Sequence, residues 1–219
     1  MVAGGLENMT NAPYILSKAR KGFRMGHADV KDHMFLDGLE DAYEEGKLMG
    51  SFAEDTAEHY QFTREQQDNF AITSLERAKK ANEDGTFNSE IVPIKVLNRK
   101  NEIIINKDEQ PFKSDIIKIP TLKPAFRKNG TVTAANSSSI SDGASSVILM
   151  LESEAQKRGI KPLARIVNHS TNSQEPKWFT TAPIGAIEKV LEKSGWKKTD
   201  VDLFEVNEAF AVVPMAVMK

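Results

Sequence analysis

The residues best suited to chemistry lie in two segments rich in small polar side chains. The first, at 131–143, reads Thr-Val-Thr-Ala-Ala-Asn-Ser-Ser-Ser-Ile-Ser-Asp-Gly, and the second, at 206–211, reads Val-Asn-Glu-Ala-Phe-Ala. Each pattern predicts a strand that ends in residues with hydrogen-bonding side chains. Because ligands in α/β proteins bind beyond the carboxyl ends of strands, we expect a ligand site where these two segments end.

The serine-rich segment has two interpretations. Its small side chains would let a ligand approach the backbone, and its hydroxyls supply hydrogen-bond donors and acceptors. A bare run of serines, however, is more often an ordinary surface loop. The complete string from residue 131 to residue 143 is more specific than the serines alone.

Asn207 also has two interpretations. It stands where a predicted strand meets a predicted helix, so its amide could hold a water molecule or polarise a developing oxyanion. Asparagine at such a position is more commonly a helix cap, and the local pattern alone favours capping.

Three further features are weaker signals. His27 and His33 have Asp29 and Asp32 between them, but the spacing matches no common ligand pattern, so we predict no metal site. The Gly4-Gly5 pair lacks a phosphate-loop pattern, and backbone packing explains it better. A basic cluster could be a solvated face or could meet phosphates, and both remain open. Its members are Lys113, Lys118, Lys123 and Arg127.

The elements that must position these residues are predicted from periodicity and end signals. Residues 63–84 should form the main helix, with a capping box at Thr63 and Gln66 and a stop at Gly85. Its expected inward stripe is Phe70, Ala71, Ser74, Leu75, Ala78 and Ala81. We also predict a hairpin at 91–105, a short helix at 152–158 and a helix at 183–194. Strands are expected at 131–135, 146–151, 163–169 and 202–206, with a helix from about residue 207. This order predicts an α/β fold with a mixed or parallel sheet.

Bulk properties exclude several classes of protein. The 219 residues carry a net charge of −2, which argues against a nucleic-acid binder that neutralises phosphates. No apolar run approaches a membrane span, and no secretory signal is visible. The absence of cysteine excludes a disulfide framework and a cysteine zinc site, and we expect a cytoplasmic protein. The chain opens on what reads as the end of a buried strand and stops inside an apolar helix, so we expect both ends to be cut.

The two polar motifs, together with several other blocks, resemble the thiolase family. The further blocks occur in family order over nearly the whole chain, at 3–14, 37–39, 49–54, 63–81 and 122–126. The resemblance implies an incomplete layered α-β-α-β-α fold with a loop domain that binds coenzyme A. It assigns 1–10 to the N-terminal domain, 11–140 to the loop domain, 141–161 again to the N-terminal domain and 162–219 to the C-terminal domain.

The resemblance also implies an activity, which is acyl transfer between coenzyme A thioesters, most like that of biosynthetic acetyl-CoA acetyltransferases. Such enzymes are usually homotetramers and need coenzyme A as a substrate, with no separate cofactor. Asn207 would anchor the water of an oxyanion hole, and Ser138 would bond the pantetheine amide. Met49, Phe126, Ala134 and Phe210 would form apolar walls of the acyl and pantetheine tunnel. Lys113, Ser114, Asp115 and Lys118 would stand near the adenosine and phosphate end.

The chain departs from the family pattern at the catalytic groups. Thiolases use a cysteine nucleophile from an upstream segment and a histidine and second cysteine from a downstream segment, and this chain has no cysteine. Loss of a nucleophile typically costs on the order of 10⁶ in turnover, so we predict that the chain alone is inactive. Phe70 replaces a tyrosine found in potassium-activated members, which argues against a potassium site. The segment 178–183 also differs from the commoner family version.

Two other interpretations stay open. A degradative 3-ketoacyl-CoA thiolase would share these motifs and have a wider acyl pocket. Alternatively, the chain could be a noncatalytic protein that binds coenzyme A or a partner, which would require a stable fold on its own.

Overall fold

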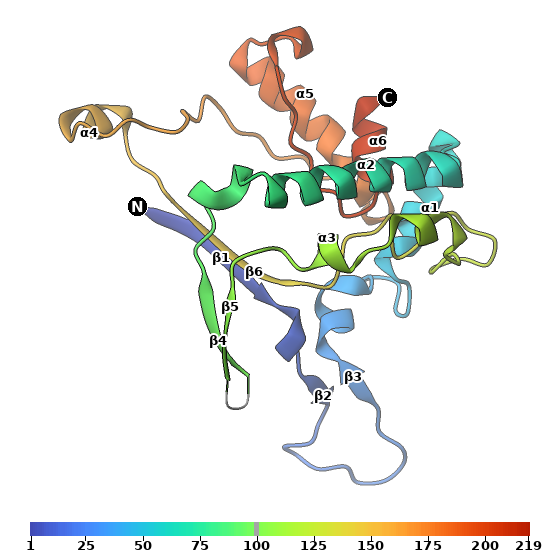
Figure 1. Cartoon of the computed structure of the whole chain (residues 1–219). Helices are drawn as coiled ribbons and strands as arrows, with labels where there is room; N and C mark the ends of the chain where they lie inside the picture. Colours follow the sequence, from blue (N-terminus) through green and yellow to red (C-terminus); the bar gives the residue numbers. More distant parts are fainter. Residues whose placement is uncertain (99–100) are drawn as a thin grey trace. The chain divides into compact units, whose positions relative to one another are not determined.

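The computed structural model describes residues 1–98 and 101–219 (Figure 1). The chain divides into two compact units. The first unit comprises Met1–Phe52, Ile140–Asn207 and Lys219. The second unit comprises Ala53–Ser139 and Glu208–Met218.

The first unit contains a long antiparallel ribbon. Strand β1 (Val2–Asn8) pairs with β6 (Asp142–Ile148), and nearly all of its residues are exposed. The expectation of a buried strand at residues 1–5 was therefore wrong, because in the described residues each strand has one partner only. A Cβ on Gly4 would lie 2.2 Å from the carbonyl oxygen of Ser145, so close backbone packing does explain this glycine.

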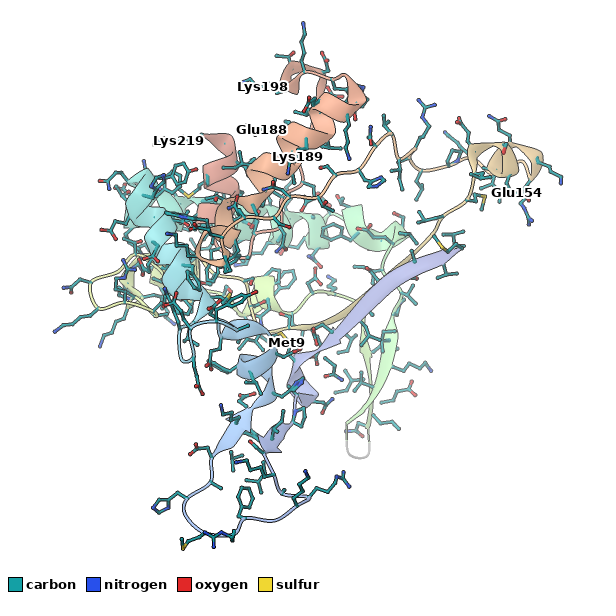
Figure 2. All side chains as sticks on the ribbon, turned by 180° about the vertical axis from the view of Figure 1, so that it is seen from behind. Met9, Glu154, Glu188, Lys189, Lys198 and Lys219 are labelled. Atoms are coloured by element: carbon teal, nitrogen blue, oxygen red, sulfur yellow. The ribbon has the colours of Figure 1, made fainter. Side chains whose placement is uncertain are left out.

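The other elements of the first unit are short. Strands β2 (Tyr14–Leu16) and β3 (Val30–Asp32) pair antiparallel, and a π-helical turn follows at Phe35–Leu39. The predicted helices near 152 and 183 are confirmed as α4 (Glu152–Lys157) and α5 (Ala182–Ser194). Both are followed by left-handed glycines, Gly159 and Gly195. Charged residues such as Glu188 and Lys189 stand on the exposed face of α5 (Figure 2). Three 3₁₀ helices complete the unit, at Met9–Asn11, Pro176–Thr181 and Lys198–Asp200.

Helix α1 (Met49–Tyr60) begins in the first unit and continues into the second, which is built around α2 (Arg64–Glu83). The capping box of Thr63 and Gln66 is present, and Gly85 follows the helix with φ of 83°, as predicted. The predicted hairpin is also confirmed as β4 (Ile94–Asn98) and β5 (Asn101–Ile105), with its turn outside the described residues. The remaining elements are α3 (Gln110–Lys113), α6 (Val212–Met218) and 3₁₀ helices at Thr86–Ser89 and Ile116–Thr121.

The core of the second unit is small. Its buried apolar residues are Ala53, Ala57, Ile119, Val132, Phe210, Ala211, Val212, Val213 and Ala216. The predicted inward stripe of α2 is only half-buried, and the buried residues of this helix are the polar Gln67, Asp68 and Asn82. A stripe that is apolar but partly open suits a binding wall better than a core.

Five predictions of regular structure were wrong. Residues 131–135 form no strand, because side chains rather than a neighbouring strand bind their backbone N–H groups. Residues 163–169 and 202–206 form no strands either, because no ladder partner lies beside them in the described part of the chain. The last helix begins at Val212 rather than near residue 207. All ladders among the described residues are antiparallel, so the expected mixed or parallel sheet is not seen. No helix in residues 1–98 and 101–219 is long and apolar enough to cross a membrane.

Candidate functional site

A cleft of about 260 Å³ lies within the second unit. Part of the lining comes from the half-buried face of α2, and the rest comes from the segment 134–139, from Gln110 to Ile119, and from Glu208 and Ala211. The lining residues are Phe70, Ala71, Ser74, Leu75, Ala78, Gln110, Pro111, Ser114, Ile119, Ala134, Ala135, Asn136, Ser137, Ser138, Ser139, Glu208 and Ala211. A lining that combines apolar side chains with several hydroxyls is suited to a ligand with methylene groups and hydrogen-bonding groups in alternation.

The backbone that enters the serine-rich wall is held by a buried carboxylate. Glu54 on α1 is only 3% exposed, and its oxygens accept hydrogen bonds from the backbone N–H groups of Thr131 and Val132, each at 2.9 Å. The Thr131 hydroxyl donates to the same carboxylate at 3.2 Å. Because both N–H groups are thereby satisfied, the strand-like sequence at 131–135 needs no ladder.

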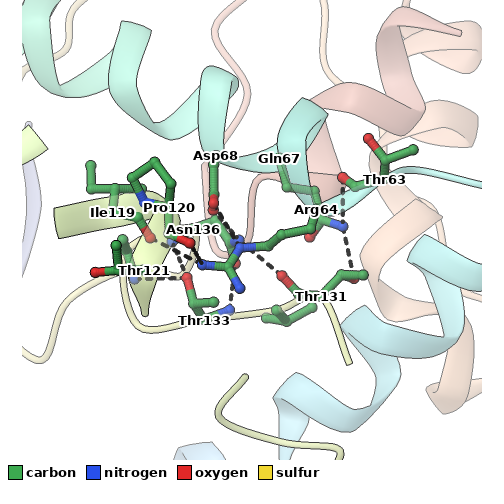
Figure 3. A network of polar contacts seen from close by, with 12 residues as sticks. Thr63, Arg64, Gln67, Asp68, Ile119, Pro120, Thr121, Thr131, Thr133 and Asn136 are labelled. Atoms are coloured by element: carbon green, nitrogen blue, oxygen red, sulfur yellow. Dashed lines mark hydrogen bonds and ion pairs between the residues drawn. The ribbon is translucent and has the colours of Figure 1, made fainter. Parts of the chain in front are cut away.

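Asn136 then fixes the turn of the chain (Figure 3). Its side-chain oxygen accepts from the Thr133 N–H at 2.8 Å, and its amide donates to Asp68 and to the Thr131 carbonyl, both at 3.1 Å. Asp68 in turn accepts from Arg64 Nε at 2.7 Å, and Arg64 also donates to the Ile119 carbonyl at 3.0 Å. Asp68 and Asn136 are 4% and 3% exposed, so this network is buried and paired.

The hydroxyl of Ser138 takes no part in this network. Ser137 Oγ donates to the Thr133 carbonyl at 2.7 Å, whereas the Ser138 hydroxyl has no partner among the described residues. Ser138 is exposed and lines the cleft, while its backbone N–H donates to the Ala209 carbonyl at 2.9 Å. The backbone at Ser138 is therefore fixed and its side chain is free to bind a ligand.

The segment after residue 207 is fastened to the same wall. Ala211 N–H donates to the Asn136 carbonyl at 2.9 Å, and Ser137 bridges to Phe210. From the other side, Ser74 on α2 donates its hydroxyl to Glu208 Oε2 at 2.7 Å. The cleft is thus closed along one side by contacts between residues far apart in the sequence.

Of the predicted site residues, the structure brings Ser114, Ala134 and Ser138 together in the cleft. Lys113 and Lys118 lie on the adjoining surface and outside the lining. Each forms an exposed ion pair, Lys113 with Glu109 at 3.4 Å and Lys118 with Asp115 at 3.3 Å. Exposed pairs of this kind are weak, so both lysines could exchange their partners for an anion.

Two predicted wall residues, Phe126 and Phe210, lie against each other instead of lining the cleft. Their rings meet edge to face with centroids 6.0 Å apart, and Phe210 is 8% exposed. This geometry is favourable for aromatic pairs and supports the 208–211 segment from behind.

Met49 and Asn207 belong to the first unit. Met49 is the half-buried first residue of α1. Asn207 is exposed, caps no helix and has no hydrogen-bond partner among the described residues. The helix-capping interpretation therefore has no support in the structure.

Several residues of the cleft and its frame were not predicted from the sequence. Glu208 lay within the second motif, and Ser74 had been placed in the core stripe of α2. Gln110 of the lining was missed, and Asn136 lay within the first motif without an assigned role. The supporting side chains of Glu54, Arg64, Gln67 and Asp68 were also missed. A polar residue within an apolar helical stripe, as at Ser74, was the one local signal of a binding wall.

Comparisons with known proteins give matches over nearly the whole chain. The family description "Thiolase, N-terminal domain" matches residues 1–153, and "Thiolase, C-terminal domain" matches residues 160–219. A "Probable acetyl-CoA acetyltransferase" of Dictyostelium discoideum is 49% identical over 99% of this chain and 52% of its own length. "Acetyl-CoA acetyltransferase 2" of Arabidopsis thaliana is 47% identical over 100% of this chain and 55% of its own.

A "Probable acetyl-CoA acyltransferase" of Staphylococcus aureus is 42% identical over 99% of this chain and 56% of its own. Among solved structures, acetyl-CoA acetyltransferases from Syntrophomonas wolfei and Bacillus anthracis both superpose with a TM-score of 0.92. They are 41% and 44% identical, over 99% of this chain and 54% and 55% of theirs. The chain spans about half the length of the relatives it matches, and over that span it has the α/β fold of thiolases. On these matches, the chain belongs to the thiolase family.

Proposed function

We propose that this chain is a segment of an acetyl-CoA acetyltransferase and that its cleft holds the pantetheine arm of an acyl-CoA. The names of the relatives from Dictyostelium and Arabidopsis support the activity. The observation that carries the binding site is the free hydroxyl of Ser138 on a wall that buried side chains hold in place.

The lining of the cleft fits the chemistry of that arm. Pantetheine alternates short methylene segments with two amides, so it needs apolar contact and hydrogen bonds along one line. Phe70 and Leu75 on α2 offer the apolar contact, and Ser138 offers a hydroxyl to an amide. The phosphates of coenzyme A would remain outside, toward Lys113 and Lys118, where loose ion pairs can open for them.

In the complete enzyme, catalysis would proceed by two acyl transfers. A cysteine thiolate would attack the acyl carbonyl carbon and expel coenzyme A, whose thiolate takes up a proton. A base would then remove the α-proton of a second acetyl-CoA, and the carbanion would attack the acyl-cysteine, forming the carbon–carbon bond and releasing the cysteine thiolate. Asn207 would hold the water that stabilises the thioester oxyanion. This chain has no cysteine, and we therefore propose that it has no turnover by itself.

The organisation of the parent protein follows from the same proposal. Residues 1–10 and 141–161 would belong to its N-terminal domain, 11–140 to the loop domain and 162–219 to its C-terminal domain. A cytoplasmic homotetramer is the assembly we propose for the complete enzyme, with coenzyme A as substrate and no separate cofactor.

A degradative 3-ketoacyl-CoA thiolase remains the second candidate, because the Staphylococcus relative is named an acyltransferase without restriction to acetyl groups. The two candidates differ in acyl chain length. When the complete enzyme is assayed by thiolysis, the proposal predicts that acetoacetyl-CoA is cleaved well and that 3-ketoacyl-CoA substrates of eight or more carbons are not. Equal cleavage of both would favour the second candidate.

Calorimetric titration with coenzyme A tests the proposed site on the chain itself. We expect saturable binding that Ser138→Ala weakens by up to about tenfold, the usual range for one lost hydrogen bond. Ser89→Ala, on an exposed 3₁₀ turn, serves as the matched control and should bind like the parent chain. Absence of binding by the folded parent chain, or equal binding by both variants, would contradict the proposal.

A further inference from the structure

The cleft contains a single group that can carry a charge. Every lining residue in the described part of the chain is apolar or carries a neutral hydroxyl or amide, except Glu208. Most of the cleft therefore offers hydrogen bonds without charge, and among the lining side chains Glu208 carries the one charge.

Hydrogen bonds hold both the side chain of Glu208 and the backbone that follows it. Its Oε2 accepts the Ser74 hydroxyl at 2.7 Å, which directs the side chain toward α2. The backbone that follows is held by the bonds from Ser138 N–H to the Ala209 carbonyl and from Ala211 N–H to the Asn136 carbonyl, both at 2.9 Å. A carboxylate oxygen can accept more than one hydrogen bond, so Glu208 retains acceptor capacity after it binds Ser74.

We infer that Glu208 is a specificity-determining residue, which admits the neutral, amide-bearing part of the ligand to the cleft and keeps anionic groups out. The inference rests on the proposed function, because it assigns the orientation of the ligand in the same cleft. A ligand N–H can donate to the free oxygen of the carboxylate, whereas a ligand carboxylate or phosphate at that place meets a like charge.

The charges outside the cleft favour the same orientation. Lys113 on α3 and Lys118 on the following 3₁₀ helix lie within five residues of the lining residue Ser114, and Lys79 on α2 donates from Nζ to the Ser114 carbonyl at 3.3 Å. A ligand with a neutral arm and an anionic end would therefore enter arm first, since the reverse orientation brings phosphates to Glu208. The cleft needs no cationic residue inside it for this selection.

A matched pair of small ligands tests the inference. Pantothenate and panthenol share the pantoyl-amide skeleton and differ at one end, where the first has a carboxylate and the second a neutral alcohol. Dissociation constants can be measured for both by ligand-observed NMR with the whole chain. We expect the parent chain to bind panthenol more tightly than pantothenate. Glu208→Gln should lower the ratio of the pantothenate dissociation constant to the panthenol dissociation constant by about threefold to fivefold, the range of one solvent-exposed charge interaction.

Two further variants separate charge from structure. Glu76→Gln changes the net charge equally on an exposed position of α2 outside the cleft, and it should keep the parent ratio. Ser74→Ala removes the hydroxyl that binds Glu208 and leaves the charge, so it should keep a preference for panthenol. Raising the salt concentration should reduce the preference of the parent chain.

The possible failures can be told apart. If the parent chain binds neither small ligand nor coenzyme A, the proposed function fails and the inference fails with it. If the parent chain binds them and Glu208→Gln keeps the full preference for panthenol, the inference alone is overturned. An equal loss of preference in Glu76→Gln would also overturn it, because the effect would then come from net charge.

Discussion

Residues 131–139, which lead into and form the serine-rich wall of the cleft, and the β1–β6 ribbon both have strand-like sequences, but different interactions hold their backbones in place. Both contain small and β-branched residues in patterns that predict strands. The ribbon is held by a backbone ladder and is almost wholly exposed, whereas the wall has no ladder and is held by buried Glu54 and Asn136. The candidate site therefore lies where side chains take the place of a ladder, because a segment without a neighbouring strand leaves one edge of its backbone open to a ligand.

The largest expected effect comes from changing Glu54, whose carboxylate binds backbone N–H groups that a neighbouring strand would otherwise bind. Glu54→Gln keeps the size of the residue but turns one acceptor toward the Thr131 and Val132 N–H groups into a donor. We expect a loss of about 3 kcal/mol in the free energy of unfolding, measured by urea denaturation. Glu58→Gln, which removes an exposed carboxylate from the same helix, should change it by less than about 1 kcal/mol. Equal effects of the two variants would contradict the special role of Glu54.

A glycine substitution in each region should affect stability differently. A Cβ at Gly130 would lie 2.0 Å from Glu54 Oε1 and 3.0 Å from the Arg127 carbonyl, whereas a Cβ at Gly5 meets nothing within 4 Å. Gly130→Ala should therefore cost about 2 kcal/mol, and Gly5→Ala should be neutral or slightly stabilising. The midpoints of thermal unfolding measure both, and a Gly130→Ala protein as stable as Gly5→Ala would show that Glu54 can move without cost.

Features of the fold and the site that depend on nearby residues could be predicted from the sequence, whereas features that depend on residues far apart in the chain could not. The ends of α2, α4 and α5 were predicted because Thr63, Gly159 and Gly195 act within one helical turn. The failure at 131–135 came from Glu54, which lies 77 residues from Thr131 and leaves no mark on the strand-like pattern. Ser138 was identified by family resemblance, while Glu208 and Ser74 meet across 134 residues and were missed.

Two aspartates with lowered pKa values should make the stability of the chain depend on pH. In the first unit, hydrogen bonds from the Thr10 N–H and hydroxyl lower the pKa of Asp142, and in the second unit, Thr86 lowers the pKa of Asp84. A lowered folded-state pKa stabilises the fold above the unfolded value of about 4, and this contribution is lost as the pH falls through the folded value. Unfolding measured from pH 6 to pH 3 should therefore decline less steeply in Asp142→Asn and in Asp84→Asn than in the parent chain. Parallel curves for a variant and the parent would contradict its hydrogen bond.

The smallest effect is expected on the ribbon surface. Leu6 on β1 is 78% exposed, so Leu6→Thr removes little buried apolar area and should change the free energy of unfolding by less than about 0.5 kcal/mol. Denaturation of the two proteins at equal concentration measures this. A loss above about 2 kcal/mol would show that this face of the ribbon is covered in solution.

Hydrogen–deuterium exchange with and without saturating coenzyme A is the decisive measurement for the cleft, because it locates the ligand as well as detecting it. We expect slower exchange at residues 134–139 and on the face of α2 around Ser74, with little change in the β1–β6 ribbon. Protection confined to the first unit, or no change at a concentration where calorimetry shows binding, would contradict the assignment of the cleft.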